Sequence, residues 1–358
     1  MKDIANIAKM RLINQQIAVN TLKTAKAVVS WMGALQAQDY AMAKWALGIR
    51  LKDSTEAMIN KAIDRGDIIR THILRPTWHF VSADDIGWML ALTAPRIRAS
   101  LKSRLKQLEL TEAILAKSKH IMEKALAGNR HLTRAALVEE LNKAGIATNE
   151  YRSGHILLHA ELEGLLCSGA QKEKDSTYAL LPERIAQIKT LPKDEALAKL
   201  AQIYFTSHGP ATLQDFIWWS GLSITEAKHA LEMIKPNFYP EKIDEQTYWI
   251  ANSFTVPKRY MDSAYLLPAF DEFIIGYTDR SATLPFEHHH KAVSSNGLFR
   301  PTIVINGQTT GIWKRALKKD KVQIELQFFQ SSGTEAQKLL HQAAKRYGAF
   351  YNLETELI

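Results

Sequence analysis

The sequence predicts a mainly helical α+β fold, in which one helical unit occurs three times and a β-rich segment follows. Segments with apolar residues at helical spacing come in groups of three. Each group is followed by two short strand-like runs joined by a turn. Beyond residue 257 the composition becomes strand-like until a final helical segment. Three helices followed by a hairpin are typical of a winged helix, so we expect three winged helices in tandem.

The first unit is expected over residues 1–115. Its predicted helices lie at 25–31, 40–51 and 54–63, and its predicted strands lie at 68–74 and 77–81. Asp53 and Ser54 suit the N-cap of the third helix, because their side-chain oxygens accept hydrogen bonds from free backbone N–H groups. Residues 33–39 join the first two helices. The stretch 91–124 is predicted to be helical, and its excess of lysine and arginine predicts a basic face.

The same order recurs in a second unit over 116–190 and a third over 191–257. The predicted helices lie at 134–143 and 153–166 in the second unit and at 194–207, 213–220 and 224–234 in the third. The predicted strands lie at 166–168, 177–181, 238–240 and 247–250. Gly145 and Gly221 separate the last two helices of each unit, as a helix-turn-helix requires.

The last predicted domain covers residues 258–358 and is rich in β-structure. Its predicted strands lie at 264–267, 301–305, 310–316 and 322–328. Asn306-Gly307 between two apolar runs is a strong hairpin signal, since both residues tolerate positive φ. The helix predicted at 334–347 is expected to cover this sheet.

Composition narrows the class of protein. Hydrophobic residues make up 46% of the 358 residues and charged residues 23%, as in folded domains. The net charge of +9 favours a polyanionic partner, with nucleic acid the first to consider. The single cysteine, Cys167, excludes an internal disulfide and a cysteine zinc cage. No signal-peptide core or membrane span is recognisable, so we expect a cytoplasmic protein that does not enter a membrane. Nucleotide hydrolysis and zinc proteolysis lack their motifs.

Gln36-Ala37-Gln38 is the main candidate for chemistry. Its two amides point to one side of an extended or turn backbone, whereas a helix would separate them. An amide is not a strong base, but its oxygen can accept from a water while its nitrogen donates, so two amides can position a water. This suits a reaction whose leaving group is already activated. The alternative is that both glutamines are helix-capping or surface residues.

Other segments carry candidate side chains beside a plainer interpretation. Arg75, Trp78 and His79 place a cation, an aromatic ring and an imidazole on one hairpin, although His79 also suits a core strand. Trp313, Lys314 and Arg315 follow the Asn306-Gly307 turn and suit phosphate contacts, or a solvated strand end.

His288-His289-His290 does not predict a metal site, because three consecutive histidines cannot all face one ion in regular structure. Cys167 lacks the context of a nucleophile and suits a small buried side chain. We therefore expect no metal site in this chain.

Several motifs together resemble the AlkZ-like (YcaQ-type) DNA glycosylase family over nearly the whole chain. They are Leu35-Gln36-Ala37-Gln38-Asp39, Trp45-Ala46-Leu47-Gly48-Ile49-Arg50, Arg75-Pro76-Thr77-Trp78-His79-Phe80-Val81, Leu266-Leu267-Pro268-Ala269-Phe270-Asp271-Glu272, Tyr277-Thr278-Asp279-Arg280 and Gly311-Ile312-Trp313-Lys314-Arg315. Each is weak alone, and the set is specific. The family has a Gln-x-Gln and a Gln-x-Asp branch, and this chain resembles the first.

The resemblance implies a C-shaped, basic enzyme that removes N7- or N3-alkylated purines from double-stranded DNA and, in some members, unhooks interstrand crosslinks. It implies that Gln36 and Gln38 are catalytic, with Asp39 and His79 as accessory residues. Arg280 joins the expected DNA contacts, which are Arg75, Trp78, Trp313, Lys314 and Arg315. We expect a monofunctional, monomeric, nucleoid-associated enzyme without a cofactor, because hydrolysis of an activated N-glycosidic bond needs only water. Ala37 is smaller than the aliphatic residue usual at this position.

Two other classes fit the same sequence. A winged-helix DNA-binding regulator would bind duplex sequence-specifically, without dependence on Gln36 or Gln38. An interaction protein that kept the scaffold would show no salt-dependent affinity for DNA.

Overall fold

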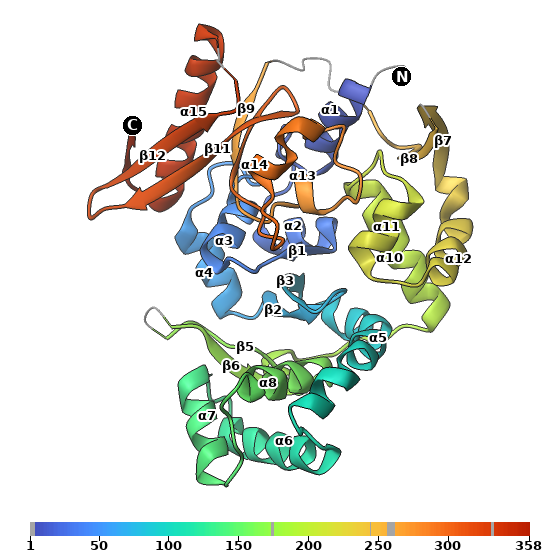
Figure 1. Cartoon of the computed structure of the whole chain (residues 1–358), viewed down its shortest axis with the longest axis vertical. Coiled ribbons are helices and arrows are strands. Elements are labelled where there is room, and N and C mark those ends of the chain that lie inside the picture. The colour runs from blue at the N-terminus through green and yellow to red at the C-terminus, as the bar shows by residue number, and fades with distance from the viewer. Residues whose placement is uncertain (1–3, 173–174, 244, 256–261, 331–332) are drawn as a thin grey trace. The chain divides into compact units, whose positions relative to one another are not determined.

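The chain forms two compact units in the computed structural model, which describes residues 4–172, 175–243, 245–255, 262–330 and 333–358 (Figure 1). Unit 1 is built from three stretches, Met1–Ile59, Leu197–Trp219 and Ser223–Ile358, and unit 2 from Asn60–Ala196 and Ser220–Leu222. Within the described ranges, no helix has both the length and the apolar character needed to cross a membrane. The predicted boundary at 257/258 falls outside the described residues.

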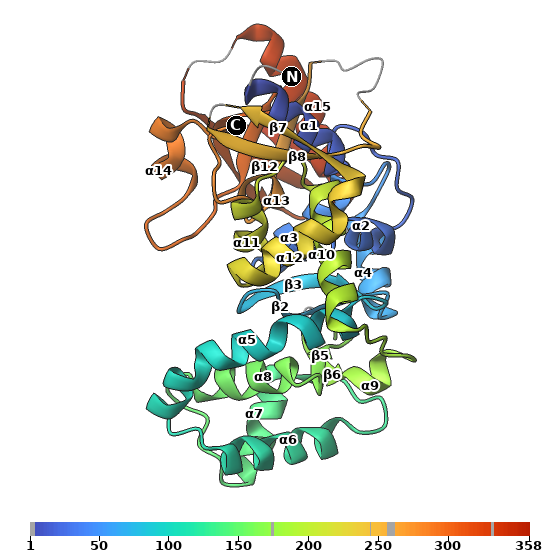
Figure 2. The same cartoon turned by 90° about the vertical axis from the view of Figure 1, so that its right-hand side faces the viewer.

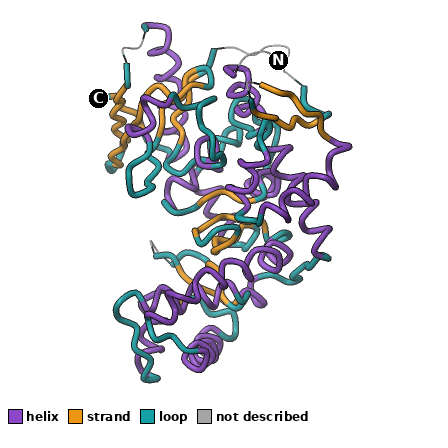
Figure 3. The backbone as a smooth tube through the Cα atoms, turned by 45° about the vertical axis from the view of Figure 1, so that its right-hand side comes forward, coloured by secondary structure: helices purple, strands orange, loops and turns teal. Residues whose placement is uncertain are grey.

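Unit 2 is mainly helical, with short strands (Figure 3). Its elements are β2 (Ile68–Ile73), β3 (Thr77–Ser82), α5 (Ile86–Gln107), α6 (Glu112–Leu126), β4 (Leu132–Thr133), α7 (Arg134–Lys143), α8 (Arg152–Leu162), β5 (Leu166–Ser168), β6 (Thr177–Leu180) and α9 (Leu181–Arg184). Strands β2 and β3 form an antiparallel hairpin. Strand β6 lies between β4 and β5, antiparallel to both.

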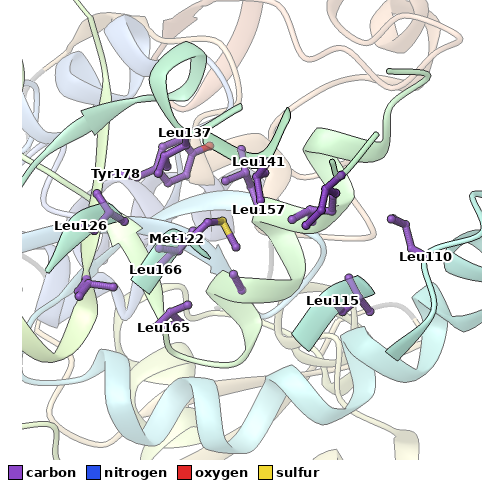
Figure 4. Close-up of a cluster of buried hydrophobic side chains, with 14 of the residues drawn as sticks. Leu110, Leu115, Met122, Leu126, Leu137, Leu141, Leu157, Leu165, Leu166 and Tyr178 are labelled. Atoms are coloured by element: carbon purple, nitrogen blue, oxygen red, sulfur yellow. The ribbon is translucent and has the colours of Figure 1, made fainter. Parts of the chain in front are cut away.

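Leucines from α6, α7, α8 and the β5–β6 hairpin form a core of unit 2 (Figure 4). Thr111 and Thr133 start α6 and α7 as N-caps, and their hydroxyls accept hydrogen bonds from Ile114 N and Ala136 N. The predicted continuous helix over 91–124 is wrong in one respect. The chain breaks between α5 and α6 at Glu109, which has a φ of +52°, so that Thr111 can cap the second helix.

Unit 1 contains the N-terminal helices and the C-terminal sheet. Its elements are α1 (Ile4–Asn14), α2 (Ala25–Met32), β1 (Ala34–Gln36), α3 (Tyr40–Gly48), α11 (Leu213–Ser220), α12 (Ile224–Ile234), η1 (Lys235–Asn237), β7 (Phe238–Ile243), β8 (Gln246–Ala251), β9 (Ala264–Leu267), α13 (Glu272–Ile275), η2 (Phe286–His288), α14 (His289–Ala292), β10 (Thr302–Ile305), β11 (Gln308–Leu317), β12 (Lys321–Phe328), α15 (Thr334–Tyr351) and β13 (Glu354–Leu357). Helices α4 (Glu56–Asp64) and α10 (Lys193–Ser207) contribute residues to both units.

The C-terminal sheet has the strand order β13-β12-β11-β10-β9. The predicted hairpin is confirmed, because Asn306 and Gly307 join β10 to β11 with φ values of +52° and +89°. Helix α15 packs against β9 and β13, which confirms the predicted covering helix. The sequence did not predict β13, which pairs with β12 in parallel.

Helix α3 packs between this sheet and α15. The Trp45 indole N–H donates to Leu266 O at 2.7 Å, and its ring contacts Tyr347 and Phe350 of α15. Gly48 leaves room for Phe350, since a Cβ at this position would lie 2.5 Å from the Phe350 ring. These contacts fix the C-terminal half of α3, the helix that follows the Gln36-Ala37-Gln38 segment.

The remaining helices of unit 1 repeat the order found around α6 to α8. Figure 2 shows α11 and α12 with the β7–β8 ribbon beside them. Strands β7 and β8 pair antiparallel, and Ala211 before α11 pairs with Trp249 of β8 in an antiparallel bridge. A capping box of Ser223 and Glu226 starts α12.

Candidate functional site

Gln36-Ala37-Gln38 forms the turn between β1 and α3 of unit 1, outside helical structure as the sequence predicts. Gln36 ends β1 and is buried, with 6% of its surface exposed, whereas Gln38 is exposed. Asp39 is the N-cap of α3, and its carboxylate accepts a hydrogen bond from Met42 N at 3.0 Å. One glutamine is therefore held in the protein and the other is open to solvent.

The buried side chain of Glu272 binds the backbone of this turn. Its Oε1 accepts a hydrogen bond from Gln36 N at 2.8 Å, and its Oε2 accepts one from the Trp219 indole N–H at 3.2 Å. Glu272 is 1% exposed and is the first residue of α13. This places a charge-bearing group next to the backbone of the predicted motif. Glu272 ends one of the motifs that resemble the family, but it was not predicted as a site residue.

The neighbouring Asp271 anchors α13 itself. Asp271 pairs with Arg50 through two hydrogen bonds of 2.9 Å, and it caps α13 by accepting from Phe273 N. Arg50 also donates to Gln15 Oε1 and to Ala46 O, each at 2.9 Å. Asp271 and Arg50 are both buried, so neither charge has water to replace its partner. Glu272 is thereby fixed relative to α3.

His208 completes the surroundings of Glu272. Its Nε2 lies 3.6 Å from Glu272 Oε2, and its ring stacks on Tyr204 with centroids 4.8 Å apart. Burial lowers the pKa of His208 below its usual value, and Arg50 and Arg11 lower it further, while Glu272 acts in the opposite direction. The imidazole is therefore neutral near pH 7.

The three DNA contacts predicted on β11 differ in their exposure to solvent. Trp313 is 1% exposed, because its indole donates to Leu267 O at 2.8 Å and its ring packs against Tyr347. The prediction that Trp313 contacts DNA is corrected by this burial, which leaves the indole almost no surface for a ligand. Arg315 is half-buried and donates to the hydroxyls of Tyr347 and Tyr351. Lys314 is exposed.

The candidates on the β2–β3 hairpin lie in unit 2. His79 is fully buried, and its Nδ1 lies 2.9 Å from Thr77 O, which is the core environment that the sequence allowed as the alternative. Trp78 is half-buried beneath the Arg70 guanidinium, which lies 4.2 Å from the indole centroid. Arg75 is half-buried at the start of the hairpin turn.

Two further candidates have no catalytic surroundings. Burial raises the pKa of the Cys167 thiol to about 12, so it is not a thiolate nucleophile. His288, His289 and His290 belong to η2 and α14. In the part of the chain that the structure describes, no three His, Cys, Asp or Glu side chains are grouped to hold a metal ion.

Comparisons with known proteins identify the family of this chain. A family model described as "DNA glycosylase AlkZ-like" matches residues 29–350, which include Gln36, Gln38 and Glu272. The chain belongs to the AlkZ-like DNA glycosylase family. It is 24% identical over 328 residues to the interstrand DNA cross-link repair glycosylase of Streptomyces sahachiroi, and the match covers 85% of each chain.

The AlkZ-like fold is confirmed by a solved structure. The DNA glycosylase AlkZ of Streptomyces sahachiroi superposes with a TM-score of 0.82, covering 100% of both chains at 18% identity. Membership of the AlkZ-like family assigns the chain to an enzyme class, the DNA glycosylases, rather than to the regulators or interaction proteins. The predicted family, enzyme class and DNA-directed activity are confirmed.

Proposed function

We propose that this glycosylase hydrolyses the N-glycosidic bond of N7- or N3-alkylated purines in duplex DNA, and that Gln36 and Gln38 position the attacking water. The supporting observation is the turn between β1 and α3, whose Gln36 N–H is held by the buried Glu272. The S. sahachiroi relative is named for interstrand cross-link repair. We therefore include crosslinks and bulky adducts among the proposed substrates.

The chemistry needs positioning more than acid catalysis. An alkylated purine carries a positive charge, so its glycosidic bond is weak and the sugar gains oxocarbenium character as the base leaves. The water oxygen bonds to C1′, the electron pair of the broken bond leaves with the base, and the water loses a proton to solvent. Two amides suit the task of holding that water.

Glu272 adds electrostatic support for the same step. Its carboxylate lies one hydrogen bond from the Gln36 backbone, and in a buried setting a negative charge favours positive charge that develops nearby. Asp39 already accepts a hydrogen bond as the α3 N-cap. We therefore assign Asp39 to shaping the turn, and the water to the two glutamines.

Two of the three predicted winged helices have support in the order of their elements. In unit 2 the order is α6, β4, α7, α8 and the β5–β6 hairpin, with β6 between β4 and β5. In unit 1, α11 and α12 follow the Ala211 bridge and precede the β7–β8 hairpin. We propose that these modules, with Lys314 and Arg280, contact DNA phosphates. We also propose that the enzyme acts as a monomer, without a cofactor, at the nucleoid.

The test is release of 7-methylguanine from a methylated duplex. Wild type is compared with the double variant Gln36→Ala, Gln38→Ala, and with Gln342→Ala, which removes an exposed glutamine of α15 in the same unit. We expect the double variant to lose about 100-fold or more in the single-turnover rate. Wild type and Gln342→Ala should release the base alike, and all three should bind the duplex equally.

A double variant that releases the base at the wild-type rate would exclude the proposed role of the pair. A wild type that binds but does not release 7-methylguanine would exclude this lesion as a substrate. The same proteins assayed on an N7-crosslinked duplex then decide whether the bulky substrate is the one processed.

A further inference from the structure

Four side chains of unit 1 form a compact surface, which we call the aromatic–arginine platform. Its members are Trp218, Phe270, Arg280 and Phe299. The Arg280 guanidinium lies 5.5 Å from the Trp218 ring centroid and 5.1 Å from that of Phe299. The rings of Phe270 and Phe299 are 6.1 Å apart. A cation thus lies between aromatic rings that come from α11 and from the loops around α13 and α14.

The platform is held in place by the backbone beneath it. The Trp218 indole N–H donates to Ile275 O at 2.9 Å, and Arg280 Nε donates to Ile274 O at 3.1 Å. Phe270 has a φ of +58°, a conformation that a bulky side chain rarely adopts. The next residue, Asp271, is fixed by its buried pair with Arg50. The surface is therefore formed before any ligand arrives.

The chemistry of the platform fits a nucleobase. Trp218 is 41% exposed and the other three members are half-buried, so part of the aromatic surface and of the cation is accessible. Aromatic rings and a guanidinium plane stack on bases irrespective of sequence. Paired bases in a duplex have their faces covered by neighbours, so the ligand that matches exposed ring faces is an unpaired base.

The platform lies beside the candidate catalytic turn. Helix α13 is four residues long, and its first residue, Glu272, binds Gln36 N while its last, Ile275, accepts from Trp218. At 1.5 Å per residue this helix is about 6 Å long. Figure 1 and Figure 2 show α11 next to α13 in both views. Helix α13 therefore connects the platform to the candidate catalytic turn.

We propose that the aromatic–arginine platform stacks an unpaired DNA base next to the damaged nucleotide. This rests on the proposed function only in taking DNA as the ligand. It assigns to Trp218 a binding role that is separate from the hydrolytic role of the glutamines. A protein partner or a phosphate alone would use the same surface differently, and the experiment separates them.

The experiment measures binding of a labelled oligodeoxythymidylate, about 15 nucleotides long, by fluorescence anisotropy at one salt concentration. We expect Trp218→Ala to raise the dissociation constant about tenfold or more, because base stacking is lost. Trp218→Phe should keep most of the affinity. Phe286→Ala, which removes a phenylalanine that is 90% exposed in η2, should bind as wild type does.

An abasic oligomer of the same length identifies the part of DNA that is bound. Wild type should bind it more weakly than oligodeoxythymidylate, and Trp218→Ala should bind it as wild type does. The proposal is overturned if Trp218→Ala binds the oligodeoxythymidylate like wild type, or if it loses affinity for the abasic oligomer equally. Release of 7-methylguanine is recorded in parallel. Failure of release leaves the stacking comparison valid, so the two proposals fail independently.

Discussion

At the scale of single residues, His208 shows how burial sets the protonation state of a side chain close to the candidate catalytic turn. A protonated imidazole 3.6 Å from Glu272 would neutralise that carboxylate. Complete burial disfavours the charged imidazole, so the pKa of His208 is lowered. The nearby Arg50 and Arg11 lower this pKa further, and the imidazole ring stacks on Tyr204. The neutral state is therefore built into the packing.

This pKa shift predicts how the stability of the protein depends on pH. The folded-state pKa of His208 lies below the usual 6.5, so its contribution is present above pH 6.5 and is lost as pH falls towards the lowered pKa. We expect acidification from about pH 7.5 to 5.5 to lower the Tm of wild type more than that of His208→Gln. Circular dichroism melts measure this.

The control for this comparison is His341→Gln, which removes an exposed imidazole from α15. Its Tm should fall with pH as in wild type. If the Tm of wild type and that of His208→Gln fell equally with pH, the result would contradict a neutral, buried His208.

Some site residues could be predicted from the sequence and others could not. Gln36 and Gln38 are recognisable because their spacing in a turn is a local property. Glu272 is not, because its hydrogen bond to Gln36 joins positions 236 residues apart. Trp313 is followed by two cations, as expected of a DNA-binding strand end. The packing of Tyr347 of α15 against its ring shows that it is a core residue instead.

At the scale of elements, glycines in two helices provide a test of how closely α3 packs against α15. A Cβ on Gly48 would lie 2.5 Å from the buried Phe350 ring, whereas a Cβ on Gly154 of α8 meets only the Arg134 side chain at 3.5 Å. We expect Gly48→Ala to lower the free energy of unfolding by about 1–3 kcal/mol through overpacking. Gly154→Ala should raise it by up to about 1 kcal/mol through helix propensity.

Urea denaturation of both variants measures these changes. A Gly48→Ala protein as stable as wild type would show that α15 does not press on α3 as described. Because α3 follows the catalytic turn, the same variant should also lose 7-methylguanine release if the turn depends on this packing.

Elements were predictable where their signals are local. Asn306-Gly307 specifies its hairpin through the backbone preferences of two residues, and the Thr133 cap specifies where α7 begins. The Thr111 cap was missed, because the helical pattern continues on both sides of it. Strand β13 was missed because its parallel pairing with β12 requires α15 to return the chain first. A parallel neighbour leaves no turn signal in the sequence.

At the scale of the whole molecule, the net charge of +9 predicts the dependence of DNA binding on salt. Binding that neutralises about four phosphates weakens about 100-fold between roughly 50 and 200 mM salt. We expect a loss of this size for an undamaged duplex, measured by anisotropy titrations. Lys314→Gln, which removes one exposed cation, should lower the slope of log affinity against log salt by about one. A salt-independent affinity would rule out phosphate contacts as the main source of binding.

The path of the chain through unit 1 has a consequence for protein synthesis. Residues before Ile59 belong to the same compact unit as Phe350, and Trp45 is enclosed by α15. A ribosome that adds roughly 5–20 residues per second makes Gln36 on the order of 15–60 s before Phe350. Unit 2 is made during that interval, whereas Trp45 of α3 gains its packing partners Tyr347 and Phe350 only when α15 has been made. A chain that ends before α15 therefore lacks the aromatic contacts that seat α3.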